Sequence, residues 1–319
     1  MAGPIHDPSM NRLPKIATAT LIIIAASIVW IYAVEPGHAN PIPSVWRPSQ
    51  HVQSFEYKAA RIDYIEEGQG PILLLLHGGG TWSYSFHKNI GTLAKHFRVI
   101  AMDMPGHGFS EIPENYGYSL VDTRKVIEAL RRHLGVDRLI IAGNSWGGGW
   151  ALDYAEHFPE HTAALILIDA AGLADTVEAD QSSWPYLTVP ILGRAILHGV
   201  FRFTVADGYR STLFHDGSKV RESTIDEVYN ALSWTPNLLA QIKYQKNLKW
   251  EETDVRMSTM RCPVLIIWGQ YDEYLDPSMA SRMAFKIPDA TLVFLPTSHL
   301  PQEEDPAAVN QRILDFLSQ

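Results

Sequence analysis

Residues 139–149 have the sequence LIIAGNSWGGG, and this stretch decides the fold. It begins with an uninterrupted apolar run, which is typical of a strand buried on both faces of a parallel sheet. A G-x-S-x-G pentapeptide, residues 143–147, follows at once, and residues 146–158 have the apolar spacing of a helix. Small residues on both sides of Ser145 allow a tight turn between strand and helix. Such a turn would present the Ser145 hydroxyl at the N-terminus of the helix, where it can act as a nucleophile.

The same alternation of apolar runs and helical patterns continues on both sides of this stretch. It predicts buried strands at 72–76, 98–102, 139–142, 164–168, 264–268 and 291–295 and helices at 121–134, 146–158, 278–287 and 307–317. Strands that alternate with helices form a parallel sheet covered on both faces. Residues 52–57 and 61–65 can add an antiparallel hairpin at one edge. We therefore predict an α/β fold with a mostly parallel eight-stranded sheet.

A long insertion interrupts this alternation after Asp169. It is rich in helix formers and aromatic residues and extends to the strand that starts near Pro263. Structureless loops longer than about 15 residues are uncommon in compact domains. We expect an inserted helical cap at residues 173–260, which divides the α/β core into residues 49–172 and 261–319.

A serine hydroxyl is a poor nucleophile near neutral pH, so Ser145 needs a base and a group that orients the base. When the nucleophile lies on a strand-to-helix turn, an acid and then a histidine follow along the chain, each after a later strand. Asp272 follows the strand at 264–268, and His299 follows the strand at 291–295. These two residues are the predicted acid and base. Three other acids remain alternatives at this stage: Glu273, Asp276 and Asp169.

The negative oxygen of a tetrahedral intermediate needs hydrogen-bond donors aimed at it. The backbone amide of Trp146, which follows the nucleophile, is one candidate. The second is the amide of Gly79, within the sequence His77-Gly78-Gly79-Gly80 that follows the strand at 72–76. His77 itself is expected to be a structural hydrogen-bonding residue. No H-E-x-x-H motif or comparable ligand spacing is present, so we expect no metal and no cofactor.

Composition excludes several classes of partner and site. The formal net charge is −9 and no run of basic residues occurs, which argues against a nucleic-acid partner. The single cysteine, Cys262, excludes an internal disulfide and a cysteine-rich zinc cluster. Nothing in the sequence indicates an oligomeric state.

The N-terminal part of the chain has a different character. Residues 16–34 carry no charge, and a helix of about 20 apolar residues can span a bilayer. Arg12 and Lys15 precede this segment, which predicts a membrane anchor with a cytoplasmic N-terminus and the catalytic domain on the outer side. The alternative is a cleaved signal peptide, with the small residues Gly37 and Ala39 at the two positions that a signal peptidase reads, and a secreted protein. We assign residues 1–48 to this segment and to a proline-rich extended tether.

Taken together, the residues from about 50 to the end resemble the α/β-hydrolase superfamily, in the branch with a helical cap after the sixth strand. The resemblance rests on a set of motifs in the familiar order: LLLLHGGG, VIAMDMPGHGFSE, IIAGNSWGGGWALDYAEHFPEH, LILIDAAG, VLIIWGQYDEYLDP and SHLPQEEDP. It implies the α/β-hydrolase fold and a Ser145, Asp272 and His299 triad.

Several members of that branch are similar in particular stretches. Residues 80–84, GTWSY, look like those of haloalkane dehalogenases, and epoxide hydrolases share the cap. Both of these families use aspartate as the nucleophile. An alkylated carboxylate is an ester that water can hydrolyse, whereas an alkylated serine would be an unreactive ether, so Ser145 favours acyl transfer. Proline iminopeptidases share the fold, but their HGGPG motif contains a proline that this sequence lacks.

The HGGG and GNSWGG stretches are similar to those of carbon-carbon hydrolases that act on meta-cleavage products. Those enzymes usually have tryptophan after the catalytic histidine, where this chain has Leu300. The N-terminal segment together with DMPGHG also looks like membrane-anchored monoacylglycerol lipases. From these similarities and the aromatic cap, the candidate substrate-binding residues are Gly80, Trp82, Trp184, Phe203 and Leu300.

The function that these observations favour is hydrolysis of carboxylic esters, monoacylglycerols among them, through an acyl-enzyme on Ser145. One alternative is carbon-carbon hydrolysis, with a cap arginine such as Arg194 or Arg202 binding a substrate carboxylate. An alternative of another class is a catalytically silent protein that uses the fold to bind a ligand.

Overall fold

The computed structural model describes residues 13–47, 51–176 and 184–318. Its centre is one eight-stranded sheet in the order β1-β2-β4-β3-β5-β6-β7-β8. The pairs β1·β2 and β2·β4 are antiparallel, and the other neighbours are parallel. The predicted mostly parallel sheet is therefore confirmed. The strands are β1 (Val52–Tyr57), β2 (Ala60–Glu67), β3 (Ile72–Leu76), β4 (Arg98–Met102), β5 (Leu139–Asn144), β6 (Thr162–Ile168), β7 (Val264–Gly269) and β8 (Ala290–Leu295).

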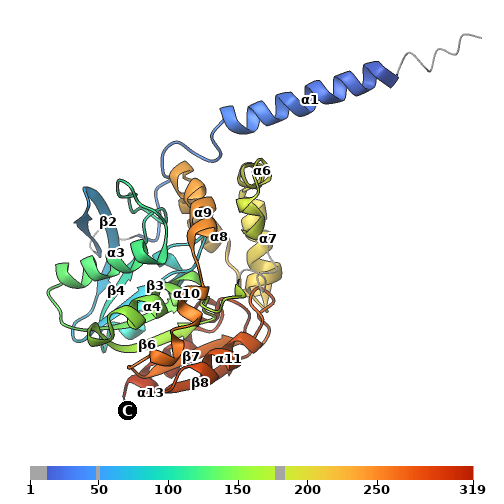
Figure 1. Cartoon of the computed structure of the whole chain (residues 1–319). Coiled ribbons are helices and arrows are strands. Elements are labelled where there is room, and N and C mark those ends of the chain that lie inside the picture. Colours follow the sequence, from blue (N-terminus) through green and yellow to red (C-terminus); the bar gives the residue numbers. More distant parts are fainter. Residues whose placement is uncertain (1–12, 48–50, 177–183, 319) are drawn as a thin grey trace, which may run out of the picture.

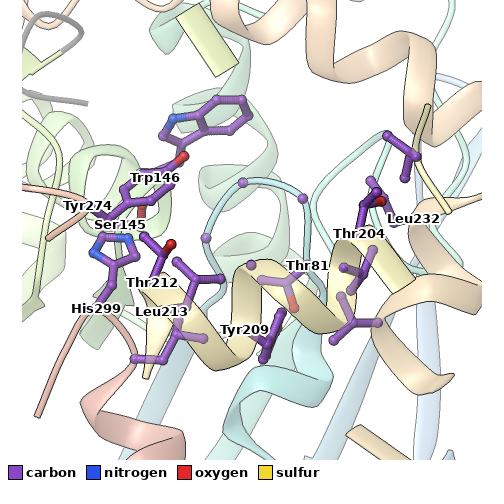
Figure 2. Close-up of a pocket in the computed structure, with 18 of the residues that line it drawn as sticks. Thr81, Ser145, Trp146, Thr204, Tyr209, Thr212, Leu213, Leu232, Tyr274 and His299 are labelled. Atoms are coloured by element: carbon purple, nitrogen blue, oxygen red, sulfur yellow. The ribbon is translucent and has the colours of Figure 1, made fainter. Parts of the chain in front are cut away.

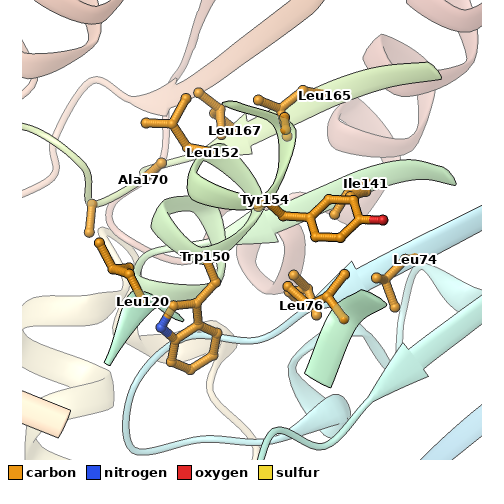
Figure 3. Close-up of a cluster of buried hydrophobic side chains, with 14 of the residues drawn as sticks. Leu74, Leu76, Leu120, Ile141, Trp150, Leu152, Tyr154, Leu165, Leu167 and Ala170 are labelled. Carbon is orange, nitrogen blue, oxygen red and sulfur yellow. The ribbon is translucent and has the colours of Figure 1, made fainter. Parts of the chain in front are cut away.

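Helices cover both faces of the sheet, as the continuous apolar runs of β3 and β7 require. The longer helices of one face, α3, α4 and α11, share a buried apolar cluster with the sheet, whereas α2 and α13 close the opposite face. Figure 3 shows Trp150 and Tyr154 of α4 packed over Leu76, Ile141 and the neighbouring strands. The helices of the core are α2 (Ile90–Leu93), α3 (Leu120–His133), α4 (Trp146–His157), α11 (Ser278–Lys286), α12 (Pro301–Glu304) and α13 (Pro306–Leu317), with short turns η1 (Ser83–Phe86) and η2 (Pro159–His161).

The described part of the segment between β6 and β7 is mostly helical and lies above the sheet (Figure 1). We call its described residues 184–260 the cap. The cap has apolar clusters of its own, and one of them includes Trp82 and Leu300 from the core. Its elements are η3 (Trp184–Thr188), α6 (Leu192–His198), α7 (Arg202–Gly208), the π-helical turn η4 (Tyr209–Leu213), η5 (Gly217–Lys219), α8 (Glu222–Leu232), α9 (Thr235–Asn247), α10 (Glu251–Asp254) and η6 (Met257–Thr259).

Residues 36–46, expected to be an extended tether, lie against the cap. The amide of His38 donates to the carbonyl of Ser233, at 2.7 Å. The amides of Val45 and Trp46 both donate to Oε1 of Glu227 on α8, at 2.8 Å each. The Trp46 ring then packs edge-on against Trp82, with ring centroids 5.5 Å apart. Residues 36–46 therefore help to hold α8 in place.

The helix α1 (Leu13–Ala33) precedes that segment and extends past the cap with its C-terminal end near α6 (Figure 1). Nε of Arg194 donates to the carbonyl of Ile31 at 2.9 Å, and the His198 ring lies 4.6 Å from the Trp30 ring. Contacts with the cap therefore hold the last turn of this helix.

The prediction of a membrane anchor is wrong on the evidence of the described residues. Within residues 13–47, 51–176 and 184–318, no helix is both long and apolar enough to cross a membrane. The localisation inferred from an anchor, with the catalytic domain on the outer side, is corrected with it.

Candidate active site

Ser145 lies on the turn between β5 and α4 in a backbone conformation that non-glycine residues rarely adopt, with φ 54° and ψ −121°. Backbone hydrogen bonds hold this strained turn on both sides. The Ser145 amide donates to the carbonyl of Ile168 at 3.1 Å, and its own carbonyl accepts from the amides of Gly149 at 3.2 Å and Ala171 at 3.0 Å. Strain that persists in a well-bonded turn is typical of functional positions.

The glycines beside Ser145 are required by close backbone contacts. A Cβ at Gly143 would overlap the backbone of Gly147, and a Cβ at Gly147 would overlap the carbonyl of Leu76 on β3. Only glycine lets the start of α4 approach the sheet this closely. The glycines of the pentapeptide are therefore needed for the packing of α4 against the sheet as well as for the turn at Ser145.

Asp272 and His299 follow β7 and β8 and meet in a buried pair. Nδ1 of His299 lies 2.8 Å from Oδ2 of Asp272. The other oxygen of Asp272 accepts from the amides of Tyr274 at 2.7 Å and Leu275 at 2.9 Å. The ring of Tyr274 stacks on the imidazole, with centroids 4.5 Å apart. Because Nδ1 faces the carboxylate, Nε2 is the nitrogen that can accept a proton from a nucleophile.

Ser145 and His299 line the same pocket, and Figure 2 shows them side by side with Trp146 above Ser145. Asn144 connects the two loops that carry them. Its Nδ2 donates to the carbonyl of His299 and to that of Ile168, both at 3.1 Å. The structure thus brings together the three residues that the sequence singled out for catalysis.

The residues predicted to bind the oxyanion also line this pocket. The backbone of Gly78 and Gly79 passes directly over the nucleophile, since a Cβ on Gly78 would lie 3.1 Å from Cβ of Ser145. A Cβ on Gly79 would lie only 2.7 Å from the Trp146 ring. Trp146 is the first residue of α4 and directly follows Ser145. The assignment of the Gly79 and Trp146 amides as oxyanion donors stays a prediction.

His77 supports this loop from below. Its Nε2 accepts from the amide of Met104 at 3.0 Å, and its Nδ1 lies 2.8 Å from the carbonyl of Gly78. Complete burial lowers the pKa of His77 to about 4. A neutral imidazole that accepts at one nitrogen and donates at the other fits a structural position.

The pocket has a volume of about 410 Å³ and lies between the core and the cap. Its walls are mainly apolar side chains of η3, α6, η4 and α8, with hydroxyl groups of Thr81, Thr204, Tyr209 and Thr212 between them. In Figure 2, Ser145 and His299 stand at one end and Thr204 and Leu232 at the other. Among the described lining residues, no side chain carries a permanent charge.

Comparison with known proteins agrees with this architecture. Residues 71–306 match the family model described as the alpha/beta hydrolase fold. The chain belongs to the α/β-hydrolase family. Haloalkane dehalogenase 2 of Mycobacterium tuberculosis is 29% identical to this chain over 275 residues, which cover 82% of this chain and 93% of the relative.

A second relative and a solved structure extend this comparison. The 2-hydroxy-6-oxononadienedioate/2-hydroxy-6-oxononatrienedioate hydrolase of Comamonas testosteroni is 28% identical over 274 residues, which cover 81% of this chain and 91% of the relative. The crystal structure of Cfl2 from Burkholderia cenocepacia shares the fold at a TM-score of 0.75 and 20% identity, and the match covers 83% of this chain and 95% of that one. This α/β-hydrolase is therefore a hydrolytic enzyme.

Only some of the residues predicted to bind substrate line the pocket of the hydrolase. Gly80 and Leu300 line the pocket. Trp82 is fully buried outside the lining, where its Nε1 donates to the carbonyl of Glu227 at 3.1 Å. Phe203 is 69% exposed and stacks on Phe201 at the surface of the cap. The side chain of Trp184 lies outside the described residues.

Sequence reasoning missed several residues of the pocket wall. Tyr209 and Thr212 belong to the π-helical turn η4, an element that no apolar periodicity announces. Tyr274 is two residues after Asp272, and its stacking on His299 depends on the path of that loop. A signal was present only for Tyr274, because it lies on the same loop as the predicted acid.

The cap arginines of the hydrolase have partners away from the pocket. Arg194 donates to the carbonyls of Ile31 in α1 and of Val34 just after it. Arg202 pairs with Glu222 at 2.6 Å and Asp226 at 2.5 Å. Neither arginine is among the residues that line the pocket. The expected carboxylate-binding arginine is therefore not placed there.

Two clusters of possible metal ligands occur among the described residues: Asp153 with Glu156 and His157, and Asp169 with Asp272 and His299. In the first cluster Arg124 donates to Asp153 at 2.9 Å, so a cation already neutralises a carboxylate there. In the second, Nδ1 of His299 is committed to Asp272. Neither donor set fits a metal well.

Proposed function

We propose that this hydrolase cleaves carboxylic esters with neutral, mainly apolar acyl groups through an acyl-enzyme on Ser145. The single observation that carries the proposal is a serine on a strained turn beside a buried His299–Asp272 pair, at the end of a pocket whose described lining has no permanently charged side chain. A nucleophile, a base and an orienting acid in this arrangement are what acyl transfer needs.

Each residue has a defined role in this mechanism. The Ser145 hydroxyl attacks the ester carbonyl while Nε2 of His299 takes its proton, and His299 then returns that proton to the departing alkoxide. Asp272 fixes the tautomer and stabilises the imidazolium. The amides of Gly79 and Trp146 bind the tetrahedral oxygen, and a donor of this kind contributes about 2.7 to 4 kcal/mol. Water, activated in turn by His299, releases the acid.

The apolar wall favours acyl chains over charged groups. Moving an uncompensated carboxylate into an apolar pocket is costly, whereas each buried methylene contributes about 0.8 kcal/mol. The pocket volume of about 410 Å³ is within the usual range for small-molecule sites. A medium-length acyl group suits both the volume and the lining.

A series of p-nitrophenyl esters of increasing acyl length tests the proposal with the full chain. We expect turnover with a maximum at intermediate length, and covalent labelling by a fluorophosphonate that mass spectrometry maps to Ser145. Ser145→Ala is the matched control and should show neither. Absence of turnover across the whole series in a folded sample, as the ligand-binding alternative requires, would contradict the proposal.

Carbon-carbon hydrolysis is the second candidate, and its support is the similarity to the Comamonas testosteroni enzyme along most of both chains. The same triad could serve it, but a dienoate substrate carries a carboxylate that the described lining does not neutralise. Loss of the visible absorbance of a meta-cleavage product, at a rate above that with esters, would favour this candidate. No change in that absorbance would remove it.

A further inference from the structure

A second buried carboxyl group lies beside the proposed triad. Asp169 follows β6 immediately and has a positive φ of 40°. Its side chain is completely buried. Oδ1 accepts from the amide of Gly269 at 2.8 Å, whereas Oδ2 has no hydrogen-bond donor among the described residues. Burying a carboxylate oxygen that accepts no hydrogen bond costs free energy, so the burial of this oxygen needs an explanation.

The candidate partner for this oxygen is another carboxylate, that of Asp272. Ligand atoms of Asp169, Asp272 and His299 lie within 4.8 Å of one another, and the two carboxyl groups are within hydrogen-bond reach. Among the described residues neither carboxyl group forms an ion pair with a lysine or arginine, and the charges of Asp272 and Glu304 both raise the pKa of Asp169. Two adjacent buried carboxyl groups without a cation between them cannot both stay ionised.

The hydrogen bonds indicate which of the two holds the proton. Asp272 accepts three donors, from the amides of Tyr274 and Leu275 and from His299, and these stabilise its charged form. Asp169 accepts only one. Burial, followed by the charge of Asp272, raises the pKa of Asp169 well above its ordinary value. A proton on Oδ2 of Asp169 would give that oxygen a partner in Asp272.

We propose that Asp169 is a protonated positioning residue that donates a hydrogen bond to the Asp272 carboxylate and so weakens the hold of that carboxylate on the His299 proton. The inference rests on the proposed serine-hydrolase function. Its consequence is that the acidic limb of the pH–activity profile lies at lower pH than it would with an aspartate that receives no such hydrogen bond.

Two substitutions separate this role from simple packing. Asp169→Asn keeps an acceptor for the Gly269 amide and supplies an N–H donor to Asp272. Asp169→Ala supplies neither. Asp153→Asn is the control, since Asp153 is also fully buried with an oxygen that lacks a donor but lies on α4 away from the pocket.

The measurement is kcat/KM for a p-nitrophenyl ester as a function of pH. We expect Asp169→Asn and Asp153→Asn to keep the acidic limb of the wild-type profile. Asp169→Ala should move that limb to higher pH by about one unit, which is a tenfold loss of activity on the acidic side. An unmoved limb in Asp169→Ala, or the same shift in Asp169→Asn, overturns the inference.

Proton NMR of the His299 Nδ1–H signal provides a second readout that does not need turnover. In the wild type this signal should shift at alkaline pH as Asp169 ionises, and in Asp169→Asn that shift should be lost. Its persistence in Asp169→Asn would contradict the inference even if Asp169→Ala fails to fold. A wild-type protein without ester turnover would instead contradict the proposed function, so the two failures are distinguishable.

Discussion

The turn around Ser145 and the cap above it contribute to the pocket in opposite ways. At the turn, close backbone contacts and a chain of hydrogen bonds fix each group, from the glycines beside Ser145 to the amides that hold Asp272. The cap contributes apolar side chains and a few hydroxyl groups, and its Arg202 pairs with Glu222 and Asp226 outside the pocket. With the proposed function, this comparison assigns the chemistry to the core and the choice of substrate to the cap.

The largest effect should come from the core. Ser145→Ala removes the nucleophile and should lower kcat for p-nitrophenyl butyrate about 10⁶-fold while the protein stays folded. Ser211→Ala is the control, because that hydroxyl lies on the exposed side of η4 and donates to the carbonyl of Asp207. Ester turnover that survives in Ser145→Ala would assign the chemistry to another residue.

A smaller loss should follow from disturbing the oxyanion site. Gly79→Ala places a Cβ 2.7 Å from the Trp146 ring, so the loop or the ring must move. Loss of one oxyanion donor costs about 10²-fold to 10³-fold in kcat. Gly208→Ala also changes a pocket glycine, but a Cβ there meets nothing within 4 Å, and its activity should stay close to wild type. Equal losses in both variants would show that added bulk, and not the oxyanion site, is responsible.

The cap should change selectivity without changing the chemistry. Leu232 lies at the end of the pocket away from Ser145, so Leu232→Phe shortens the space for an acyl chain (Figure 2). We expect kcat/KM to fall about tenfold for the octanoate and to change little for the acetate, since pocket contacts of this size are worth about 1 to 3 kcal/mol. Leu192→Phe on the exposed side of α6 is the control. A uniform loss with both esters would place the effect at the reacting groups.

The smallest effect should come from the cap arginines. Arg202→Ala and Arg210→Ala each break exposed ion pairs with Glu222, and such pairs contribute about 0 to 1 kcal/mol. Ester turnover should stay within about twofold of wild type, and the free energy of unfolding should change by about 0.5 kcal/mol or less in chemical denaturation. If the protein hydrolyses a dienoate and either arginine substitution abolishes that activity, the contrast between core and cap is wrong. The cap would then supply a charged group to the site.

The sequence predicted the core and its candidate site better than the cap. The strands and the positions of Ser145, Asp272 and His299 depend on local patterns, since a buried strand followed by a turn places its next residues at a known edge of the sheet. The burial of Trp82 and Phe203 depends on how the cap helices, which share no common pattern, pack on one another and on the core. Trp82 is buried, whereas Phe203 faces solvent. Asp169 was one of the possible acids in the sequence, but its contact with Asp272 required the sheet order that places β6 beside β7.

The bond from the amides of Val45 and Trp46 to Glu227 has a practical consequence for preparing this enzyme. A shortened chain that starts at the first strand would keep every residue of the proposed triad. It would also leave the buried carboxylate of Glu227 without its two donors, at a cost of about 1 to 3 kcal/mol. That carboxylate lies on the helix that carries Val228 and Leu232 into the pocket. We therefore expect a chain trimmed at the N-terminus to differ from the full chain in how α8 packs over the pocket, and a p-nitrophenyl ester series measured on both would show whether its acyl-length preference changes with it.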